Sequence, residues 1–264
     1  MSGNEARPSA TWDPGQYLRF ADHRLRPALD LLARVPLEAP ARLVELGCGA
    51  GNMTAILKQR FPVADVTGVD GSAEMLARAR VNAPGCRFIQ ADFTTWQPEV
   101  APDLIYSNAA LHWVGDHEML FSRLMRLIQA GGVLAVQMPA MHDAPLRRLQ
   151  YEVAAHGPWS ERLAGHGSAP SILDAAGYWD LLRPLAASLE IWETTYIHPL
   201  QGEDPVVEWA AGSSLRPFLE PLDTERQAAF RRAYAEALRP HYPRRSDGTT
   251  LLPFRRLFIV AQVA

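Results

Sequence analysis

Apolar and polar positions alternate along the first half of the chain in a way that predicts a series of strands and helices. Short apolar runs predict buried strands at 42–48, 63–70, 87–92, 104–108 and 133–138. Apolar residues spaced three or four apart predict helices at 16–35, 52–60, 72–81 and 116–129. Asn52 and Ser72 stand at the starts of two of these helices and are expected to cap them. This alternation is typical of a doubly wound, parallel α/β sheet with helices on both faces.

The pattern changes after Pro139. Residues 140–190 and 201–248 are mostly helical in character and are interrupted by glycine and proline. Between and after these stretches, residues 190–199 and 257–263 return to the alternation of a strand. Together with the five earlier strands they predict a seven-stranded, mostly parallel sheet.

These elements predict one domain over residues 1–264, without a separate second domain. The N-terminal helix and the ligand-binding α/β half occupy residues 1–139. Residues 140–264 hold the last strands and a helical lid, which is expected at about 140–190 and 201–248, inserted around those strands.

Composition places the chain among soluble globular proteins. Of its 264 residues, 48% are apolar and 21% are charged, and 26 Lys and Arg against 29 Asp and Glu give a net charge of −3. Two cysteines exclude a disulfide scaffold and a four-cysteine zinc site, and we expect no metal. No segment approaches the roughly 20 apolar residues that span a bilayer, and the polar first residues do not form a signal peptide.

The charge balance narrows the range of partners. A nearly neutral chain without a basic block does not favour nucleic acid. We therefore expect a cytoplasmic protein that acts on a small molecule and has no nucleic-acid or membrane partner. The sequence leaves the oligomeric state open between a monomer and a homodimer.

A glycine-rich loop follows the first predicted strand and precedes a helix. Its glycines, Gly47, Gly49 and Gly51, permit positive φ angles and let a ligand approach the backbone closely. The spacing is G-x-G-x-G, whereas a dinucleotide fingerprint requires G-x-G-x-x-G. Glu45, which precedes the first glycine, is also unlike a site designed for a pyrophosphate. The loop therefore favours a ligand without a diphosphate.

Two acidic residues end the next two predicted strands. Asp70 closes the second strand, where a carboxylate can accept hydrogen bonds from both hydroxyls of a ribose. Asp92 closes the third, where it could accept from the exocyclic amino group of an adenine. Either one alone could be a helix cap or a strand-end turn. In conjunction with the glycine loop, they predict a nucleoside site.

The segment from Glu45 to Gly51, Asp70 and Asp92 resembles the successive motifs of the class I S-adenosylmethionine-dependent methyltransferases. The resemblance covers residues 42–139 and implies a Rossmann-like fold with S-adenosyl-L-methionine as cofactor. It implies that the loop receives the methionine moiety, the second-strand acid the ribose, and the third-strand acid the adenine. The expected cofactor-binding residues are Tyr17, Arg24, Glu45, Gly47, Gly49, Gly51, Asp70, Gly71, Met75, Asp92, Phe93 and Asn108.

Four further segments, at 12–22, 107–113, 191–196 and 207–217, resemble a branch of this family that forms monomethyl esters of a small tricarboxylate. A carboxylate is already ionised at neutral pH, so methyl transfer to it needs no general base. Catalysis would then consist of positioning and electrostatics. We expect the reacting carboxylate to be oriented by Gln16, His112 and Trp113.

The remaining carboxylates have three candidate partners in the second half of the chain. Arg216 offers a planar guanidinium suited to bidentate binding, and Tyr196 and Trp209 offer polar aromatic groups. Tyr196 and Trp209 could equally be core residues, and Arg216 a solvated surface residue.

Several other functions stay open at this point. The chain could methylate another small carboxylic acid or small metabolite. A nicotinamide oxidoreductase is disfavoured by the position of Gly51 and by Glu45. A non-catalytic S-adenosylmethionine-binding module is disfavoured by the aromatic and basic residues of the predicted lid.

Overall fold

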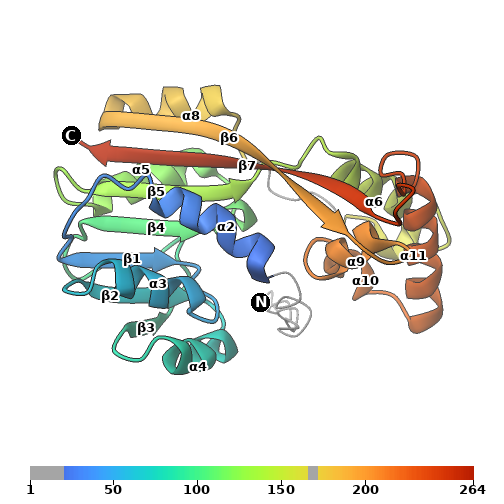
Figure 1. Cartoon of the computed structure of the whole chain (residues 1–264), viewed down its shortest axis with the longest axis horizontal. Helices are drawn as coiled ribbons and strands as arrows, with labels where there is room; N and C mark the ends of the chain where they lie inside the picture. Colours follow the sequence, from blue (N-terminus) through green and yellow to red (C-terminus); the bar gives the residue numbers. More distant parts are fainter. Residues whose placement is uncertain (1–20, 166–171) are drawn as a thin grey trace, which may run out of the picture. The chain divides into compact units, whose positions relative to one another are not determined.

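A computed structural model describes residues 21–165 and 172–264 of the chain, with side chains from Leu25 onward. The described residues form a seven-stranded sheet in the order β3-β2-β1-β4-β5-β7-β6 (Figure 1). Strands β1 to β5 pair in parallel, and β7 pairs antiparallel with β5. The expected seven-stranded, mostly parallel, doubly wound sheet is confirmed. The strands are β1 Arg42–Leu46, β2 Asp65–Asp70, β3 Arg87–Gln90, β4 Leu104–Asn108, β5 Val133–Pro139, β6 Ala186–Leu200 and β7 Thr250–Val263.

The helices lie close to the positions that the apolar spacing predicts. The observed α-helices are α2 Ala21–Leu32, α3 Asn52–Arg60, α4 Ala73–Asn82, α5 His117–Leu127, α6 Pro145–Ala155, α7 Ser160–Leu163, α8 Ala175–Leu182, α9 Pro205–Ala211, α10 Arg216–Leu219 and α11 Thr224–Leu238. Two short 3-10 turns are η1 Leu111–Trp113 and η2 Arg183–Leu185.

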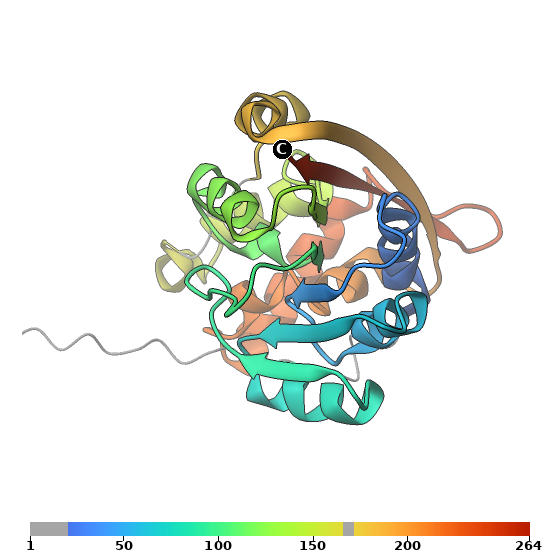
Figure 2. The same cartoon turned by 90° about the vertical axis from the view of Figure 1, so that its left-hand side faces the viewer.

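Alternate residues of each central strand pack into two separate cores on opposite faces of the sheet. On β5, Leu134, Val136 and Met138 join a cluster that contains residues of α5 and α8. Val133 and Ala135 join the other cluster, which contains residues of α2 and α3. Figure 2 shows these helices on the two sides of the sheet. Since side chains alternate between faces along a strand, this pattern fixes the face to which each polar residue at the strand ends belongs.

The helix starts confirm one expected cap and correct the other. The Ser72 hydroxyl accepts a hydrogen bond of 3.3 Å from the amide of Met75 and caps α4, as expected. The N-cap of α3 is Gly51, whose φ is 78° and whose side chain offers no capping group. Asn52 was the expected cap, and it is instead the first helical residue. The glycine loop needs a left-handed turn there, and this requirement takes precedence over side-chain capping.

Contacts between Cα atoms divide the described residues into two compact units. The sheet unit comprises 22–140, 172–196 and 254–264, and the helical unit comprises 141–165 and 197–253. The stretch expected as a first lid segment, at about 140–190, is therefore shared between the units, with α8 in the sheet unit. The assignment of the whole chain to a single domain stays a prediction.

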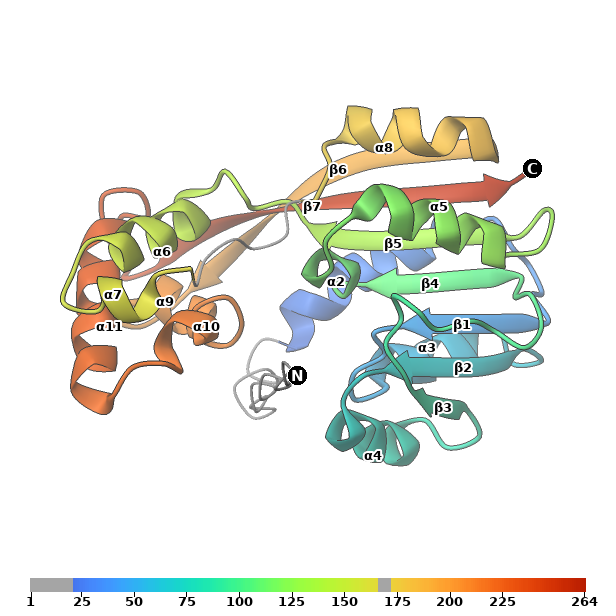
Figure 3. The ribbon, with the colours of Figure 1, turned by 180° about the vertical axis from the view of Figure 1, so that it is seen from behind.

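Helices α6, α7, α9, α10 and α11 make up the helical unit (Figure 3). Aromatic rings fill its interior, where the ring centroids of Trp159 and Phe230 lie 5.1 Å apart. Among the described residues, no helix is both long enough and apolar enough to cross a membrane.

Candidate active site

The loop after β1 combines three glycines in left-handed backbone conformations, with φ of 72° at Gly47, 52° at Gly49 and 78° at Gly51. A Cβ on Gly47 would lie 2.1 Å from the Cβ of Ala110, and a Cβ on Gly51 would lie 2.9 Å from Ala79. These two glycines are therefore required by the packing of the chain on itself. A Cβ on Gly49 would meet nothing within 4 Å. Gly49 thus leaves space at the loop where a ligand can approach the backbone.

Asp70, at the end of β2, joins this loop to the start of α4. Its Oδ2 accepts a hydrogen bond of 2.8 Å from the amide of Gly49, and its Oδ1 accepts one of 2.9 Å from the amide of Ser72. Each carboxylate oxygen has a further lone pair, so both can still accept from a ligand hydroxyl. The position beside the open side of Gly49 suits the ribose role expected for Asp70.

Glu45, in contrast, is buried within the sheet unit. Its carboxyl accepts a hydrogen bond from the hydroxyl of Thr54 on α3, and its side chain is buried. Burial raises the pKa of Glu45 to about 8, an effect that the Thr54 hydrogen bond opposes and the charge of Asp70 reinforces. Glu45 is therefore protonated at neutral pH and links β1 to α3. This placement favours a structural role over the direct cofactor contact expected for it.

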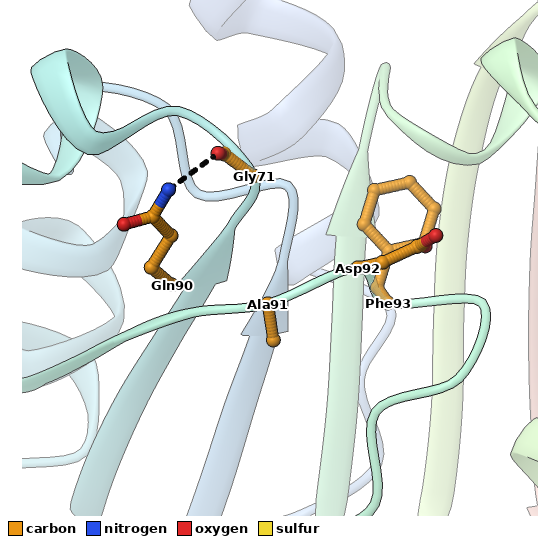
Figure 4. A pocket seen from close by; sticks show the side chains of 5 residues that line it. All are labelled: Gly71, Gln90, Ala91, Asp92 and Phe93. Atoms are coloured by element: carbon orange, nitrogen blue, oxygen red, sulfur yellow. Dashed lines mark hydrogen bonds between the residues drawn. The ribbon is translucent and has the colours of Figure 1, made fainter. Parts of the chain in front are cut away.

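A cavity of about 470 Å³ lies at the ends of β2 and β3. It is lined by Gly71, Gln90, Ala91, Asp92 and Phe93. Figure 4 shows Gln90 bonded to the carbonyl oxygen of Gly71, at 3.2 Å, with Asp92 and Phe93 beyond Ala91. The cavity therefore brings together three of the expected cofactor-binding residues.

The carboxylate of Asp92 is held in place by its own turn. Its Oδ1 accepts hydrogen bonds from the hydroxyl of Thr94, at 2.7 Å, and from the amide of Thr94, at 2.8 Å. These two hydrogen bonds lower the pKa of Asp92, so the group is ionised at neutral pH. An ionised carboxylate at the wall of a cavity is a suitable acceptor for an amino group. Met75, another expected contact, is buried on α4.

The chain turns sharply where β4 ends. Ala109 has a φ of 53°, a strained value for a residue with a side chain, and its amide donates a 2.9 Å hydrogen bond to the carbonyl oxygen of Gln137. The turn leads into η1, where the rings of His112 and Trp113 lie 4.6 Å apart. Trp113 is 48% exposed. Two of the three residues expected to orient the substrate are therefore adjacent, at the carboxyl end of β4.

Several expected site residues cannot be placed with these. Gln16 and Tyr17 lie outside the described residues, and so does the side chain of Arg24. Tyr196 is placed elsewhere, because it belongs to the core cluster that contains α2 and α3. Its hydroxyl donates a 2.6 Å hydrogen bond to Oδ2 of Asp30 on α2. This placement favours the alternative of a core residue, and the carboxylate-binding role of Tyr196 stays a prediction.

The other two substrate candidates belong to the helical unit. Trp209 is buried on α9, and its ring stacks on that of His198 at 4.6 Å, which is the arrangement of a core residue. Arg216 begins α10 and forms an ion pair of 3.1 Å with Glu220, one helical turn further on. The role of Arg216 in substrate binding stays a prediction.

One polar residue at this edge of the sheet was missed by sequence reasoning. Gln137 on β5 is completely buried, in the register position paired with Asn108 of β4. The available signal was a single polar residue near the carboxyl end of the otherwise apolar run 133–138.

Comparisons with known proteins agree with this geometry. Residues 43–132 match the model of a methyltransferase domain. A solved phosphoethanolamine N-methyltransferase 2 from Haemonchus contortus, in complex with S-adenosylhomocysteine, superposes with a TM-score of 0.54 at 18% identity and covers 90% of this chain and 53% of its own. The YcgJ protein from Bacillus subtilis superposes with a TM-score of 0.57 at 15% identity and covers 90% of this chain and 98% of its own. The fold is thus that of a Rossmann-like methyltransferase.

Full-length relatives narrow this class. A trans-aconitate 2-methyltransferase of Methylobacterium radiotolerans is 50% identical over 97% of this chain and 99% of its own length. A second protein of the same name, from Paracidovorax citrulli, is 48% identical over 95% of this chain and 98% of its own. The chain belongs to the trans-aconitate 2-methyltransferase family. The methyltransferase class and the tricarboxylate branch expected from the sequence are both confirmed.

Proposed function

We propose that the protein transfers the methyl group of S-adenosyl-L-methionine to a carboxylate of trans-aconitate, giving the monomethyl ester and S-adenosylhomocysteine. One observation carries this proposal: three features lie together at the carboxyl edge of the sheet. They are the open backbone at Gly49, the carboxylate of Asp70 and the cavity at Asp92. The full-length similarity to trans-aconitate 2-methyltransferases supports the choice of substrate.

The residues at this edge fit a nucleoside better than a dinucleotide. Asp70 can accept from the ribose hydroxyls, and Asp92 can accept from the adenine amino group beside the Phe93 ring. The amide of Gly49, which could otherwise face a phosphate, donates to Asp70 instead. These features argue against the nicotinamide oxidoreductase alternative.

The chemistry requires little from the protein beyond positioning. S-adenosylmethionine, when bound, supplies a methyl group attached to a sulfonium sulfur. A carbon–oxygen bond forms on the substrate carboxylate while the carbon–sulfur bond breaks, and the electron pair stays on sulfur, so no proton is moved. His112 and Trp113 are the placed candidates for orienting the carboxylate, and orientation alone can supply roughly 7–11 kcal/mol.

A methyl-transfer assay on the full chain tests this proposal. Trans-aconitate, cis-aconitate, isocitrate, citrate and acetate would each be incubated with S-adenosylmethionine, and both the ester and S-adenosylhomocysteine would be quantified by mass spectrometry. We expect ester from trans-aconitate at the highest kcat/KM. Turnover of another small acid alone would replace the substrate and keep the reaction class, and the absence of any product would overturn the proposal.

We also propose that the reaction takes place in the cytoplasm. Cys48 and Cys86 are both free thiols, which suits a reducing compartment.

A further inference from the structure

Two buried amide side chains at the carboxyl edge of the sheet have polar atoms without partners. Neither Oε1 nor Nε2 of Gln137 has a hydrogen-bond partner among the described residues, and the same holds for Oδ1 of Asn108. Gln137 is 0% exposed. A buried amide is almost always hydrogen-bonded, because leaving it unpaired forfeits the bonds that it makes with water. The missing partner is therefore expected to be a ligand.

The two amides belong to the same face and to neighbouring strands. Asn108 and Gln137 are partners in the parallel register of β4 and β5. Tyr106 and Ala135, two residues before them, both pack into the cluster that contains α2 and α3. Because side chains alternate along a strand, Asn108 and Gln137 project from this same face.

This pair is continuous with the glycine loop. Ala110, two residues after Asn108, occupies the space that a Cβ on Gly47 would need. The amide of Ala109, between them, bonds to the carbonyl oxygen of Gln137. Strands in a sheet are spaced by about 4.8 Å, so β4 lies roughly 10 Å from β2, across β1. A ligand with its ribose at Asp70 would extend along this edge toward Asn108 and Gln137.

The unpaired atoms indicate which part of a ligand they take. Two are carbonyl oxygens, which need a donor, and one is an NH₂ group, which needs an acceptor. A tricarboxylate offers only acceptors and would leave both carbonyl oxygens facing an anion. An ammonium group beside a carboxylate satisfies all three atoms. This combination occurs at the amino-acid end of S-adenosylmethionine.

We infer that Gln137, together with Asn108, binds the ammonium and carboxylate groups of the methionine moiety. This inference rests on the proposed function, because it takes the adenosine end of the same cofactor to lie at Asp70 and Asp92. It assigns a role in cofactor specificity to Gln137, which lies on β5 and belongs neither to the glycine loop nor to the pair of acids that end β2 and β3.

Binding calorimetry with two ligands tests the inference without any turnover. S-adenosylhomocysteine carries the amino-acid end, whereas 5′-methylthioadenosine has the same adenosine and thioether without it. Gln137→Leu should weaken S-adenosylhomocysteine by about 10- to 100-fold, as expected for hydrogen bonds to charged groups, and leave 5′-methylthioadenosine within about twofold. Gln137→Glu, which keeps the length of the side chain, should also discriminate between the two ligands because its charge repels the ligand carboxylate.

A matched control is Gln150→Leu, since Gln150 is an equally buried glutamine in the helical unit. It should leave both affinities unchanged. An equal loss of both ligands in Gln137→Leu, or unchanged S-adenosylhomocysteine with a raised KM for trans-aconitate, would overturn the inference. If the unaltered protein binds S-adenosylhomocysteine but does not turn over trans-aconitate, only the proposed substrate fails. If it does not bind S-adenosylhomocysteine at all, the proposed function and this inference fail together.

Discussion

Two fully buried glutamines, one in each compact unit, differ in what they bond to. Gln150 on α6 donates to the hydroxyl of Ser214 at 2.8 Å and to that of Tyr234 at 3.3 Å, and it accepts from Arg147 at 3.3 Å. The side chain of Gln137 on β5 has no hydrogen-bond partner among the residues that the structure describes. The two side chains share residue type and burial, so the difference lies in their surroundings. In the helical unit the buried amide is paired within the fold, whereas at the edge of the sheet it is left for a ligand.

The same contrast extends to neighbouring polar groups. In the helical unit, the Tyr234 hydroxyl donates to the carbonyl oxygen of Leu146, and the Tyr242 hydroxyl accepts from the amide of Leu146. At the sheet edge, the two carboxylate oxygens of Asp70 accept hydrogen bonds from the backbone amides of Gly49 and Ser72. Each oxygen keeps a further lone pair. These polar groups of the helical unit are thus paired within the fold, whereas Asp70 and Gln137 at the sheet edge keep hydrogen-bonding capacity that a ligand can use.

Asp70→Ala should produce the largest effect, because it removes the acceptor for both ribose hydroxyls as well as the link to Gly49. Each hydrogen bond to a charged group contributes about 1.5–3 kcal/mol, so the affinity for S-adenosylhomocysteine should fall by at least about 100-fold in calorimetry. Asp65, an exposed acid at the start of the same strand, provides the control. If Asp65→Ala weakened binding as much as Asp70→Ala, the ribose role would be wrong.

Glu45→Gln should change stability in a pH-dependent way. The pKa of Glu45 is raised from 4.5 to about 8 in the folded protein, so the folded state holds a proton that the unfolded state releases between these values. Stability therefore falls as pH rises through this window. Glutamine keeps a neutral group beside Thr54, so the variant should gain up to about 3 kcal/mol relative to the unaltered protein at pH 7.

Urea unfolding at pH 5, 6, 7 and 8 measures this gain, which should grow with each step. The control variant is Glu99→Gln, which changes an exposed glutamate. Its stability should depend on pH in the same way as that of the unaltered protein. A gain from Glu45→Gln that does not vary with pH would show that Glu45 is ionised in the folded protein.

Much of the fold could be predicted because its signals are local. The bounds of β4 and α3 agree with the predicted ranges to the residue, since apolar runs and spacing define both. The cap at Ser72 follows from its own side chain and the helix after it. The position of Gly51, rather than Asn52, as the N-cap of α3 and the division into two units depend on packing against distant residues, which a single sequence does not specify.

The site could be predicted only where a motif names it. The glycine loop, Asp70 and Asp92 occur at the ends of strands, where parallel topology brings them to one edge. The face to which Tyr196 points depends on how β6 packs against α2, so the sequence could not decide between a core residue and a binding residue there. Gln137 becomes a candidate only when the register beside Asn108 and the absence of a partner among the described residues are both known.

Gln150→Leu should have a smaller effect, and one of a different kind from Gln137→Leu. It removes the partner of the Ser214 hydroxyl and leaves that buried group unpaired, so the free energy of unfolding should fall by about 1–3 kcal/mol. Gln137→Leu removes a buried amide that satisfies no other group of the fold, so its free energy of unfolding should stay the same or rise. Urea unfolding of both variants without ligand tests this reversal. A larger loss of stability in Gln137→Leu would break the comparison between the two units.

Arg216→Ala should have the smallest effect on substrate binding. Arg216 is the charged side chain of the helical unit that we still expect to bind the substrate. Its pair with Glu220 joins residues four apart on one helix, and a pair of this kind contributes at most about 0.5 kcal/mol, so stability should hardly change. We expect the KM for trans-aconitate to rise by about fivefold, the equivalent of about 1 kcal/mol, and the affinity for S-adenosylhomocysteine to stay the same. Arg239, which pairs with Asp204 in the same unit, is the control. If the KM of Arg216→Ala were as low as that of Arg239→Ala, Arg216 would be a surface residue without a role in binding. The helical unit would then have no identified cationic partner for the substrate.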